Sequence, residues 1–449
     1  MINARTLAFQ VLLHMEQKVA YPDRLIRSTL ARHELLEDRE RALLTELVYG
    51  VLRRQGWLDW HIDRLSRIRP DKILPPVRIL LRLALYQIFF LDRVPPHAAV
   101  NEAVKMARAT QPRYIWGFVN ALLREAIRRG DNWDRPSPEK DPVEYLAVET
   151  SHPAWFADRC IRELGFEEAR DLCMADNTVA PVVLRVNPLK TTAAEVMKIL
   201  EQSGIDFEPS PWVPGAVRVS GMRQDLTRMP MFKDGLVQVQ DEASQLVSTV
   251  VAPRPGERVL DLCAGFGGKS THLGLIMANA GEIVAVEKHA WKVEELRENA
   301  ARQGLTVVHP VARDALEVDE GEIGLFDRVL LDAPCSGLGT LRRNPDIKWR
   351  LHVKDPYRFS RLQGQLLERA SRFVRPSGVM VYATCTLFSE ENEDVVSGFV
   401  QAHADWEFES VEQFLPENCR ALVQGTFLRS WPHRHGIDGF FIARLRRSR

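Results

Sequence analysis

Arg328-Val329-Leu330-Leu331-Asp332-Ala333-Pro334-Cys335 is the stretch that decides the fold. Its first four residues are typical of a buried parallel strand, and a turn with a carboxylate and a thiol follows at once. A second stretch repeats this arrangement, because Val379-Met380-Val381-Tyr382 leads into Ala383-Thr384-Cys385-Thr386. In an open α/β sheet the carboxyl ends of neighbouring strands line the ligand crevice. The sequence therefore predicts that two thiols and a carboxylate face one pocket.

These three groups suit methylation at C5 of a pyrimidine. C5 of cytosine is a weak nucleophile, and a thiolate that adds to C6 enables C5 to attack an electrophilic methyl group. A carboxyl group near N3 protonates or hydrogen-bonds the ring as charge develops there. A second thiol or another base then helps to remove the C5 proton and expel the first thiol. Buried cysteines are more often plain small hydrophobic residues, but two beside Asp332 favour a working site.

Strands and helices alternate from about residue 238 onward, which is typical of a doubly wound α/β sheet. The first strand, 258–262, enters the turn Cys263-Ala264-Gly265-Phe266-Gly267-Gly268-Lys269. The second strand, 282–287, ends on an acid, and a third strand region leads to Asp314. We expect the fourth strand to be the one that ends at Asp332.

The glycine-rich turn and the acids at the strand ends predict a cofactor site. Glycine lets the backbone approach a ligand closely because it has no Cβ, although this feature serves dinucleotides and S-adenosylmethionine alike. Four acids would form an acidic rim: Asp261, Glu287, Asp314 and Asp332. Such a rim suits a sulfonium and an ammonium group but repels a pyrophosphate, and the turn does not have the spacing GxGxxG. S-adenosyl-L-methionine is therefore the expected cofactor, and an NAD-dependent dehydrogenase is the disfavoured alternative.

The remainder of the 449 residues divides by composition. Residues 1–129 carry apolar stripes at helical spacing and predict an all-helical domain. Residues 130–143 are rich in proline and charge and predict a linker. Residues 144–237 mix expected helices with strands, of which 182–186 is among the clearest, and predict a small α+β domain. The last domain, 238–449, is the expected catalytic domain.

Composition gives few clues to partners. The chain has 60 Lys and Arg against 60 Asp and Glu, so a surface for nucleic acid must arise from local segregation of charge. Its six cysteines lack metal-ligand spacing, which predicts no metal and the reduced thiols of a cytoplasmic protein. The apolar stretch 77–91 is interrupted by Arg78 and Arg82 and is shorter than the roughly 20 residues that span a membrane. We expect a monomer without a membrane span.

These motifs resemble those of the RNA cytosine-5 methyltransferases of the Nop/Sun group. Residues 332–349 are similar to the fourth motif of that family, and residues 382–386 with 390–393 to its sixth. The turn 263–269 is similar to the cofactor motif, and 240–244 and 438–441 also fit. Two positions depart from the pattern, since Phe266 replaces the usual Pro and Trp291-Lys292 replace a smaller residue and Arg.

The resemblance implies roles that the residues alone leave open. It assigns the attacking thiolate to Cys385 and product release to Cys335, whereas either thiol fits either step on chemical grounds. Asp332 has two possible duties, at the cofactor and at the cytosine ring. Lys269 could steer RNA phosphate, lower the pKa of a thiol or simply start a helix at the surface. The implied cofactor-binding residues are Cys263, Ala264, Gly265, Phe266, Gly267, Gly268, Lys269, Glu287, Asp314 and Asp332.

The amino-terminal helices resemble the NusB-like RNA-binding domain in residues 8–12, 47–51 and 96–104. A NusB-like domain ahead of this catalytic domain resembles the bacterial Sun/Fmu type, which methylates small-subunit (16S) ribosomal RNA. The implied fold is a Rossmann-like methyltransferase domain preceded by a small α+β domain and the helical domain. We expect the RNA to be held partly by the helical domain and partly by Arg342-Arg343. A tRNA cytosine-5 methyltransferase and a non-catalytic RNA-binding ribosome-assembly factor are the alternatives.

Overall fold

The structure is a computed structural model that describes residues 3–18, 20–130, 132–133, 135–220 and 226–448. The chain forms two compact units. Unit 1 comprises Met1–Thr178 and Asn344–Arg350, and unit 2 comprises Val179–Arg343 and Leu351–Arg449. Within the predicted linker, Asp131 and Asp134 lie outside the described residues.

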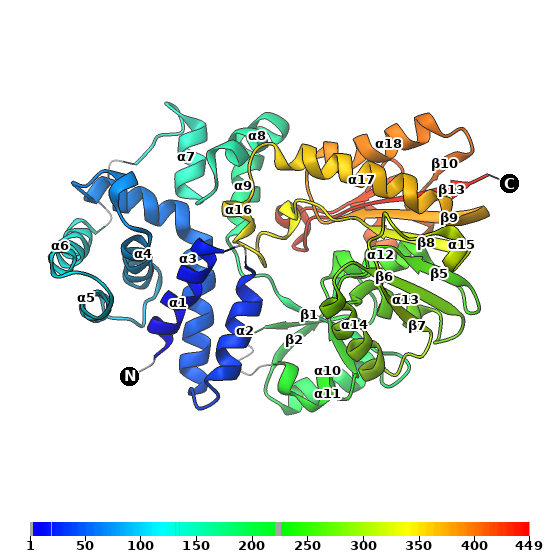
Figure 1. The fold of residues 1–449 in the computed structure, drawn as a ribbon, viewed down its shortest axis with the longest axis horizontal. Coiled ribbons are helices and arrows are strands. Elements are labelled where there is room, and N and C mark those ends of the chain that lie inside the picture. Colours follow the sequence, from blue (N-terminus) through cyan, green and yellow to red (C-terminus); the bar gives the residue numbers. More distant parts are fainter. Residues whose placement is uncertain (1–2, 19, 131, 134, 221–225, 449) are drawn as a thin grey trace. The chain divides into compact units, whose positions relative to one another are not determined.

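The described residues of unit 1 form helices and connecting loops, as the apolar stripes predict (Figure 1). The helices are α1 (Ala4–Gln17), α2 (Pro22–Arg32), α3 (Asp38–Leu65), η1 (Pro70–Lys72), α4 (Pro75–Phe90), α5 (Pro96–Thr110), α6 (Arg113–Arg129), α7 (Pro142–Glu149), α8 (Ala154–Leu164), α9 (Phe166–Asp176) and α16 (Ile347–Arg350). Proline begins α2, α4 and α5, where its missing N–H costs nothing and its fixed φ suits the first turn. Leu47, Leu58 and Leu81 are fully buried in the core of this unit.

A short segment of the catalytic sequence, Asn344–Arg350, packs within unit 1. The buried Lys348 ammonium donates hydrogen bonds to the carbonyl oxygens of Arg53 and Ser151 at 3.0 and 2.9 Å, and to Asn177 Oδ1 at 3.1 Å. Burial lowers the pKa of Lys348, and these acceptors satisfy its donors. The segment that follows the Cys335 turn is therefore anchored on helices of the amino-terminal part.

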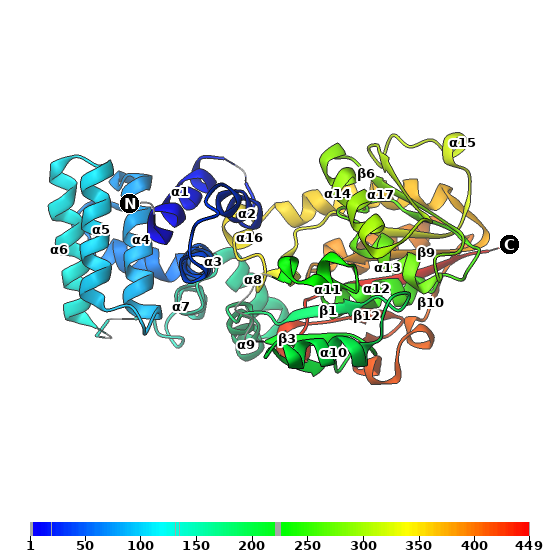
Figure 2. The same ribbon diagram turned by 90° about the horizontal axis from the view of Figure 1, so that it is seen from below.

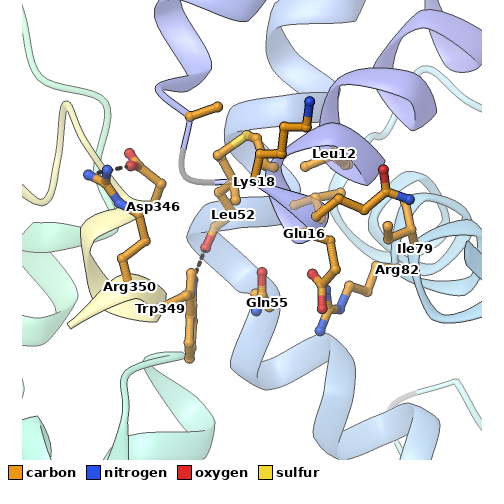
Figure 3. Close-up of a pocket in the computed structure, with 14 residues that line it drawn as sticks. Leu12, Glu16, Lys18, Leu52, Gln55, Ile79, Arg82, Asp346, Trp349 and Arg350 are labelled. Atoms are coloured by element: carbon orange, nitrogen blue, oxygen red, sulfur yellow. Dashed lines mark hydrogen bonds and ion pairs between the residues drawn. The ribbon is translucent and has the colours of Figure 1, made fainter. Parts of the chain in front are cut away.

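Trp349 supplies a second anchor in unit 1. Its indole Nε1 donates to the carbonyl oxygen of Leu52 in α3 at 2.6 Å. Figure 3 shows this bond beside a cavity of about 400 Å³, which Trp349 lines together with Leu52, Gln55 and Arg82. Gly56 lies against the ring, and a Cβ there would come within 2.9 Å of it. Glycine at this position thus allows the indole to pack closely on α3.

Unit 2 begins with a small α+β part, whereas residues 144–178 of the predicted α+β domain 144–237 belong to unit 1. Its elements are β1 (Val182–Val186), α10 (Ala193–Gln202), β2 (Asp206–Pro209), β3 (Val217–Ser220), η2 (Leu226–Arg228), α11 (Pro230–Lys233) and β4 (Val237–Val239). The strands form an antiparallel sheet in the order β2-β3-β1-β4. A capping box of Thr192 and Glu195 begins α10, which satisfies two of the free N–H groups at its start.

The larger sheet of unit 2 carries the strands predicted to end at the site. Its helices are α12 (Glu242–Val251), α13 (Gly268–Ile276), α14 (Ala290–Gln303), α15 (Glu320–Ile323), η3 (Leu338–Thr340), α17 (Asp355–Arg372), η4 (Ser389–Glu391), α18 (Glu393–Ala402), η5 (Val411–Phe414), η6 (Glu417–Leu422) and α19 (Pro432–His435). Its strands are β5 (Arg258–Asp261), β6 (Glu282–Glu287), β7 (Val308–Ala312), β8 (Phe326–Asp332), β9 (Val374–Thr384), β10 (Trp406–Glu409), β11 (Val423–Gln424), β12 (Phe427–Arg429) and β13 (Phe441–Arg447).

The strand order is β11-β12-β13-β9-β8-β5-β6-β7, with β10 paired to β13. β5 to β9 pair in parallel, whereas β13 pairs antiparallel with β9 and also carries β10 and β12. The predicted doubly wound sheet is thus mixed, because its last strand returns beside β9.

Helices cover both faces of this sheet. Val259 and Leu330 face the cluster formed with α12, α13 and α14, while the alternate residues Leu260 and Val329 face the one formed with α17 and α18. Figure 2 shows the larger sheet of unit 2 at right angles to the first view. Burial on both faces explains why these strands read as continuous apolar runs.

The chain reverses its direction of progression across the sheet at β5. The strands β6 and β7 extend the sheet on one side of β5, and β8 and β9 extend it on the other. Such a switch point opens a crevice beyond the carboxyl ends of the strands. The turns after β5 and β8 border this crevice, and these turns carry the predicted site residues.

Candidate active site

The turn between β5 and α13 has the backbone that a close ligand contact needs. Gly265 and Gly267 have φ of 56° and 77°, a left-handed conformation that glycine adopts without strain. A Cβ at Gly267 would lie 2.5 Å from Leu296 Cγ, so the turn also packs tightly on α14. The N–H of Gly267 donates to the carbonyl oxygen of Ala264 at 2.9 Å. The predicted cofactor turn is therefore a compact loop at the switch point.

Three of the four predicted rim acids lie at or just after the ends of β6, β7 and β8; Asp314 and Asp332 are partly exposed, and Glu287 is 8% exposed. Glu287 lies at the end of β6, where its carboxylate accepts a hydrogen bond from the N–H of His289 at 2.8 Å. Asp314 follows β7 and pairs with Lys288 at 2.7 Å, and this hydrogen bond lowers its pKa. Asp332 ends β8. β6 and β7 are neighbours in the sheet, and β5 separates β6 from β8.

Asp261 does not belong to this rim, which corrects the sequence-based expectation. It is fully buried and accepts a hydrogen bond from Ser270 Oγ at 2.6 Å. Burial raises the pKa of Asp261 to about 7, so its carboxyl is only partly ionised at neutral pH. Its bond to Ser270 ties the end of β5 to α13, which is a structural task.

Lys269 and Asp332 form an ion pair across the crevice. Lys269 Nζ lies 2.5 Å from Asp332 Oδ2, and its side chain is 11% exposed. Burial alone would lower the pKa of Lys269, but the charge and hydrogen bond of Asp332 outweigh it, and Cys385 and Asp261 add to the upward shift. Lys269 is therefore a buried cation beside the site, and the expectation of an ordinary surface lysine is wrong.

The two predicted thiols lie against each other. Cys335 Sγ and Cys385 Sγ are 3.3 Å apart, because β8 and β9 are paired in parallel with Asp332 opposite Ala383. The N–H of Ala333 donates to the carbonyl oxygen of Ala383 at 2.9 Å, which continues this pairing into the turn. The contact with Cys385 and burial raise the pKa of Cys335 well above its ordinary value. Cys335 is thus held as a neutral thiol beside Cys385.

Glu391 holds both thiol-bearing turns, and sequence reasoning assigned it no role. Its carboxylate accepts hydrogen bonds from the N–H of Ser336 at 2.8 Å and from Thr386 Oγ1 at 3.2 Å. These residues follow Cys335 and Cys385, and their hydroxyls are 2.6 Å apart. Burial raises the pKa of Glu391. The only sequence signal was its place in the run of acids behind the second thiol, a position as typical of solvated surface.

The two departures from the family pattern lie next to each other. Phe266 is 45% exposed, and its ring packs edge-on against Trp291 with centroids 5.6 Å apart. Lys292 Nζ lies 5.7 Å from the Phe266 ring and 3.7 Å from Glu287 Oε2. Phe266, Trp291 and Lys292 therefore form one cluster at the rim.

Arg342 is buried and Arg343 is 26% exposed, and both are held in ion pairs within the protein, which argues against their expected role in holding RNA. Arg343 donates to Asp241 and Asp438, each at 2.8 Å, and to the carbonyl oxygen of Pro181 at 3.0 Å. Arg342 is 6% exposed and lies 3.4 Å from Asp438. Both guanidinium groups join elements within unit 2.

Among the residues the structure describes, none of the helices has the length and apolar character needed to cross a lipid bilayer. In the same part of the chain, no cluster of three or more His, Cys, Asp or Glu side chains is arranged to hold a metal ion.

Comparison with known protein families gives three matches along the chain. Residues 248–446 match the family described as 16S rRNA methyltransferase RsmB/F. Residues 2–128 match the NusB family, and residues 152–224 match the ferredoxin-like domain of RsmF/B-like methyltransferases. These matches confirm the helical, α+β and Rossmann-like parts expected from the sequence.

Curated relatives cover the whole chain. The probable ribosomal RNA small subunit methyltransferase B of Bacillus subtilis (strain 168) is 38% identical over 449 residues, which is 99% of each chain. The corresponding protein of Synechocystis is 36% identical over 449 residues and covers 100% of each chain. The crystal structure of the protein PH0851 is 30% identical, covers 99% of each chain and has a TM-score of 0.83. The chain belongs to the RsmB/F family of 16S rRNA methyltransferases, with S-adenosyl-L-methionine as the methyl donor.

Proposed function

We propose that this enzyme methylates C5 of a cytidine in 16S rRNA through a covalent bond between Cys385 and C6 of the base. The observation that carries the proposal is the pair of thiols, 3.3 Å apart at the ends of β8 and β9, with the Lys269–Asp332 ion pair in the same crevice. Methylation at a nitrogen or at a ribose oxygen needs no thiol, whereas methylation at C5 needs a nucleophile to activate the ring.

Different side chains of the enzyme carry out the steps of the first half of the reaction. The Cys385 thiolate forms a bond to C6, and the electrons of the C5–C6 double bond become available at C5. Lys269 lies near enough for its charge and that of Cys385 to interact, so it stabilises the thiolate. Cys335 remains a neutral thiol at this stage, because its pKa is raised, and this favours Cys385 as the attacking group. Asp332, the ion-pair partner of Lys269, would hydrogen-bond the ring as charge develops.

The second half of the reaction restores the ring. The proton on C5 leaves to a base, its bonding electrons re-form the C5–C6 double bond, and the bond between C6 and Cys385 breaks. The contact between Cys335 and Cys385 supports a role of Cys335 in this release. The substrate base must first leave its stack, since C6 cannot reach a thiolate inside a helix.

The residues at the switch point fit S-adenosylmethionine. The left-handed turn at Gly265 and Gly267 leaves room for backbone contact, Glu287 would accept hydrogen bonds from ribose hydroxyls, and Asp314 would accept one from the adenine amine. Asp332 would face the positively charged end of the cofactor. The cofactor supplies an electrophilic methyl group. We propose the whole turn 263–269 as the remainder of this binding site.

The test is methyl transfer from labelled S-adenosylmethionine to unmethylated 16S rRNA, with bulk tRNA as the comparison and nucleoside analysis of the product. Label in 5-methylcytidine from rRNA alone is expected. Label in another nucleoside of rRNA would overturn the C5 assignment while the family activity stands. Label in tRNA would move the substrate and leave the chemistry in place.

We further propose a monomer that acts in the cytoplasm on ribosomal RNA, with functional domains at 1–129, 144–237 and 238–449. The RNA substrate of the family supports this location. Light scattering on the purified enzyme with and without rRNA tests the monomer, and a mass of two chains per particle would contradict it.

A further inference from the structure

A strongly basic surface with an exposed aromatic ring lies at the start of α17. Four of its side chains carry or can carry positive charge and are exposed: His352, Lys354, Arg358 and Arg361. Tyr357 is 55% exposed among them. We call the exposed side chains of residues 352–361 the α17 surface. All of these residues belong to unit 2, which also holds the thiols.

Unlike Arg342 and Arg343, the cations of the α17 surface are not held by buried acids. Lys354 and Arg361 have no ion-pair partner among the residues that the structure describes. Arg358 pairs with Asp355 at 2.9 Å, but its side chain is 80% exposed, and exposed pairs of this kind hold their partners weakly. The α17 surface thus presents three permanent cations to solvent.

An apolar groove runs beside these cations. It has a volume of about 340 Å³ and is lined by Leu351, Asp355, Arg358, Phe359 and Leu362. Cations that flank exposed aromatic and apolar surface are the combination that single-stranded nucleic acid needs, because phosphates bind the cations while bases stack on rings. A lipid surface or an acidic peptide would not require an exposed tyrosine between the cations.

α17 also connects this surface to the reacting thiols. Gln363, two residues after Arg361, donates from Nε2 to the carbonyl oxygen of Pro334 at 3.0 Å and to Glu391 Oε2 at 3.1 Å. Pro334 immediately precedes Cys335. At 1.5 Å of rise per residue, Tyr357 lies about 9 Å along the helix axis from Gln363. The α17 surface and the side chain that holds the thiol turn therefore belong to the same helix, a short axial distance apart.

We propose that the α17 surface binds the rRNA strand next to the target cytidine, with phosphates on Lys354, Arg358 and Arg361 and one unstacked base on Tyr357. This inference rests on the proposed site at Cys385 for its position beside the target base. It deepens that function, since it gives the contact that Arg342 and Arg343 were expected to make.

The experiment combines salt-dependent rRNA binding with steady-state kinetics on the full-length enzyme. We expect the variant Lys354→Ala/Arg358→Ala/Arg361→Ala to raise KM for rRNA at least tenfold. Its log Kd against log salt should lose a slope of about 2, since each phosphate contact to a single strand contributes ~0.7. The affinity for S-adenosylmethionine and kcat at saturating rRNA should stay unchanged.

Two matched controls separate binding from general damage. Arg372 is an exposed cation at the other end of α17, and Arg372→Ala should leave KM and the salt slope as in the wild type. Tyr357→Ala should weaken rRNA binding about tenfold through lost stacking, and Tyr357→Phe, which keeps the ring, should restore it.

An unchanged KM and salt slope in the triple variant would overturn the proposal. So would a variant that methylates naked rRNA normally and fails only on ribosomal particles, because the contact would then be to protein. A wild type that binds rRNA with the expected salt slope but yields no 5-methylcytidine would refute the proposed function and leave the binding surface standing.

Discussion

At the scale of single residues, charge differs on the two sides of the thiol pair. The Lys269 ammonium interacts with Cys385 and pairs with Asp332, whereas Glu391 lies behind Cys335 and its charge adds to the raised pKa of that thiol. This difference supports attack by Cys385, which chemistry alone does not decide. Only the family resemblance assigned these roles from the sequence.

Replacement of Lys269 tests the cation beside the nucleophile. We expect Lys269→Met to lower kcat about 100-fold, the usual scale for loss of one electrostatic stabiliser. Steady-state kinetics at saturating rRNA and S-adenosylmethionine measure this loss. Lys198→Met removes an exposed lysine of α10 and serves as the control, with kcat as in the wild type. A Lys269→Met variant with unchanged kcat would contradict the role.

Replacement of Asp261 tests the buried carboxyl under the cofactor turn. The pKa of Asp261 is about 7 in the folded protein and about 4 in an unfolded chain. Between these values the folded state holds a proton that the unfolded state has released, so the free energy of unfolding falls as pH rises from 4 to 7 and is level above 7.

The Asp261→Asn variant should lack this pH-dependent part of the free energy of unfolding. Between pH 5 and pH 8 the free energy of unfolding of the wild type should fall by about 3 kcal/mol more than that of the variant. The difference arises from pH 5 to pH 7, at about 1.36 kcal/mol per pH unit. Urea unfolding followed by tryptophan fluorescence at both pH values measures the difference. Parallel pH dependence in the two proteins would mean that Asp261 is ionised throughout.

At the scale of elements, strand ends were predictable and long-range polar contacts were not. The apolar runs before Asp332 and Cys385 mark β8 and β9, because strands buried on both faces leave a continuous pattern. The ion pairs of Arg343 leave no such pattern, since its partners Asp241 and Asp438 are about a hundred residues away on either side. The sequence analysis does not predict the antiparallel strand β13, which pairs with β9 from about sixty residues further along the chain.

Arg343 therefore belongs to the framework of unit 2. Arg343→Met should lower the free energy of unfolding by about 3–5 kcal/mol, because two buried acids lose their partner. The slope of log Kd for rRNA against log salt should stay as in the wild type, unlike that of the triple variant at α17. Chemical unfolding and filter binding provide the two measurements. A reduced salt slope with unchanged stability would restore the original expectation of an RNA contact.

At the scale of the whole molecule, the division between units differs from the division along the sequence. The chain leaves unit 2 at Asn344 and returns at Leu351, only nine residues after Cys335. No sequence signal marked this excursion, because Lys348 and Trp349 bond mainly to backbone carbonyls of Leu52, Arg53 and Ser151. Backbone acceptors are alike at every residue and leave no pattern in composition.

Removal of residues 1–143 tests whether the helical part of the chain binds rRNA. We expect the truncated enzyme to lose affinity for rRNA at least tenfold more than affinity for S-adenosylmethionine, because the cofactor residues all lie in unit 2. Titration calorimetry with the cofactor and filter binding with rRNA compare the two losses. The truncation also removes Leu52 and Arg53, so Lys348→Met in the full chain is the control for loss of that anchor. Equal loss of both affinities in the truncated enzyme alone would contradict an RNA-binding task.

The measurement that tests the central claim most directly is isolation of a covalent enzyme–rRNA complex on a denaturing gel. Cys335→Ala should accumulate the complex in the presence of S-adenosylmethionine, because attack by Cys385 is intact and release is slowed. Cys385→Ala and the double variant should give none and no turnover. A complex formed by Cys385→Ala, or normal turnover by either single variant, would contradict the assignment of the two thiols.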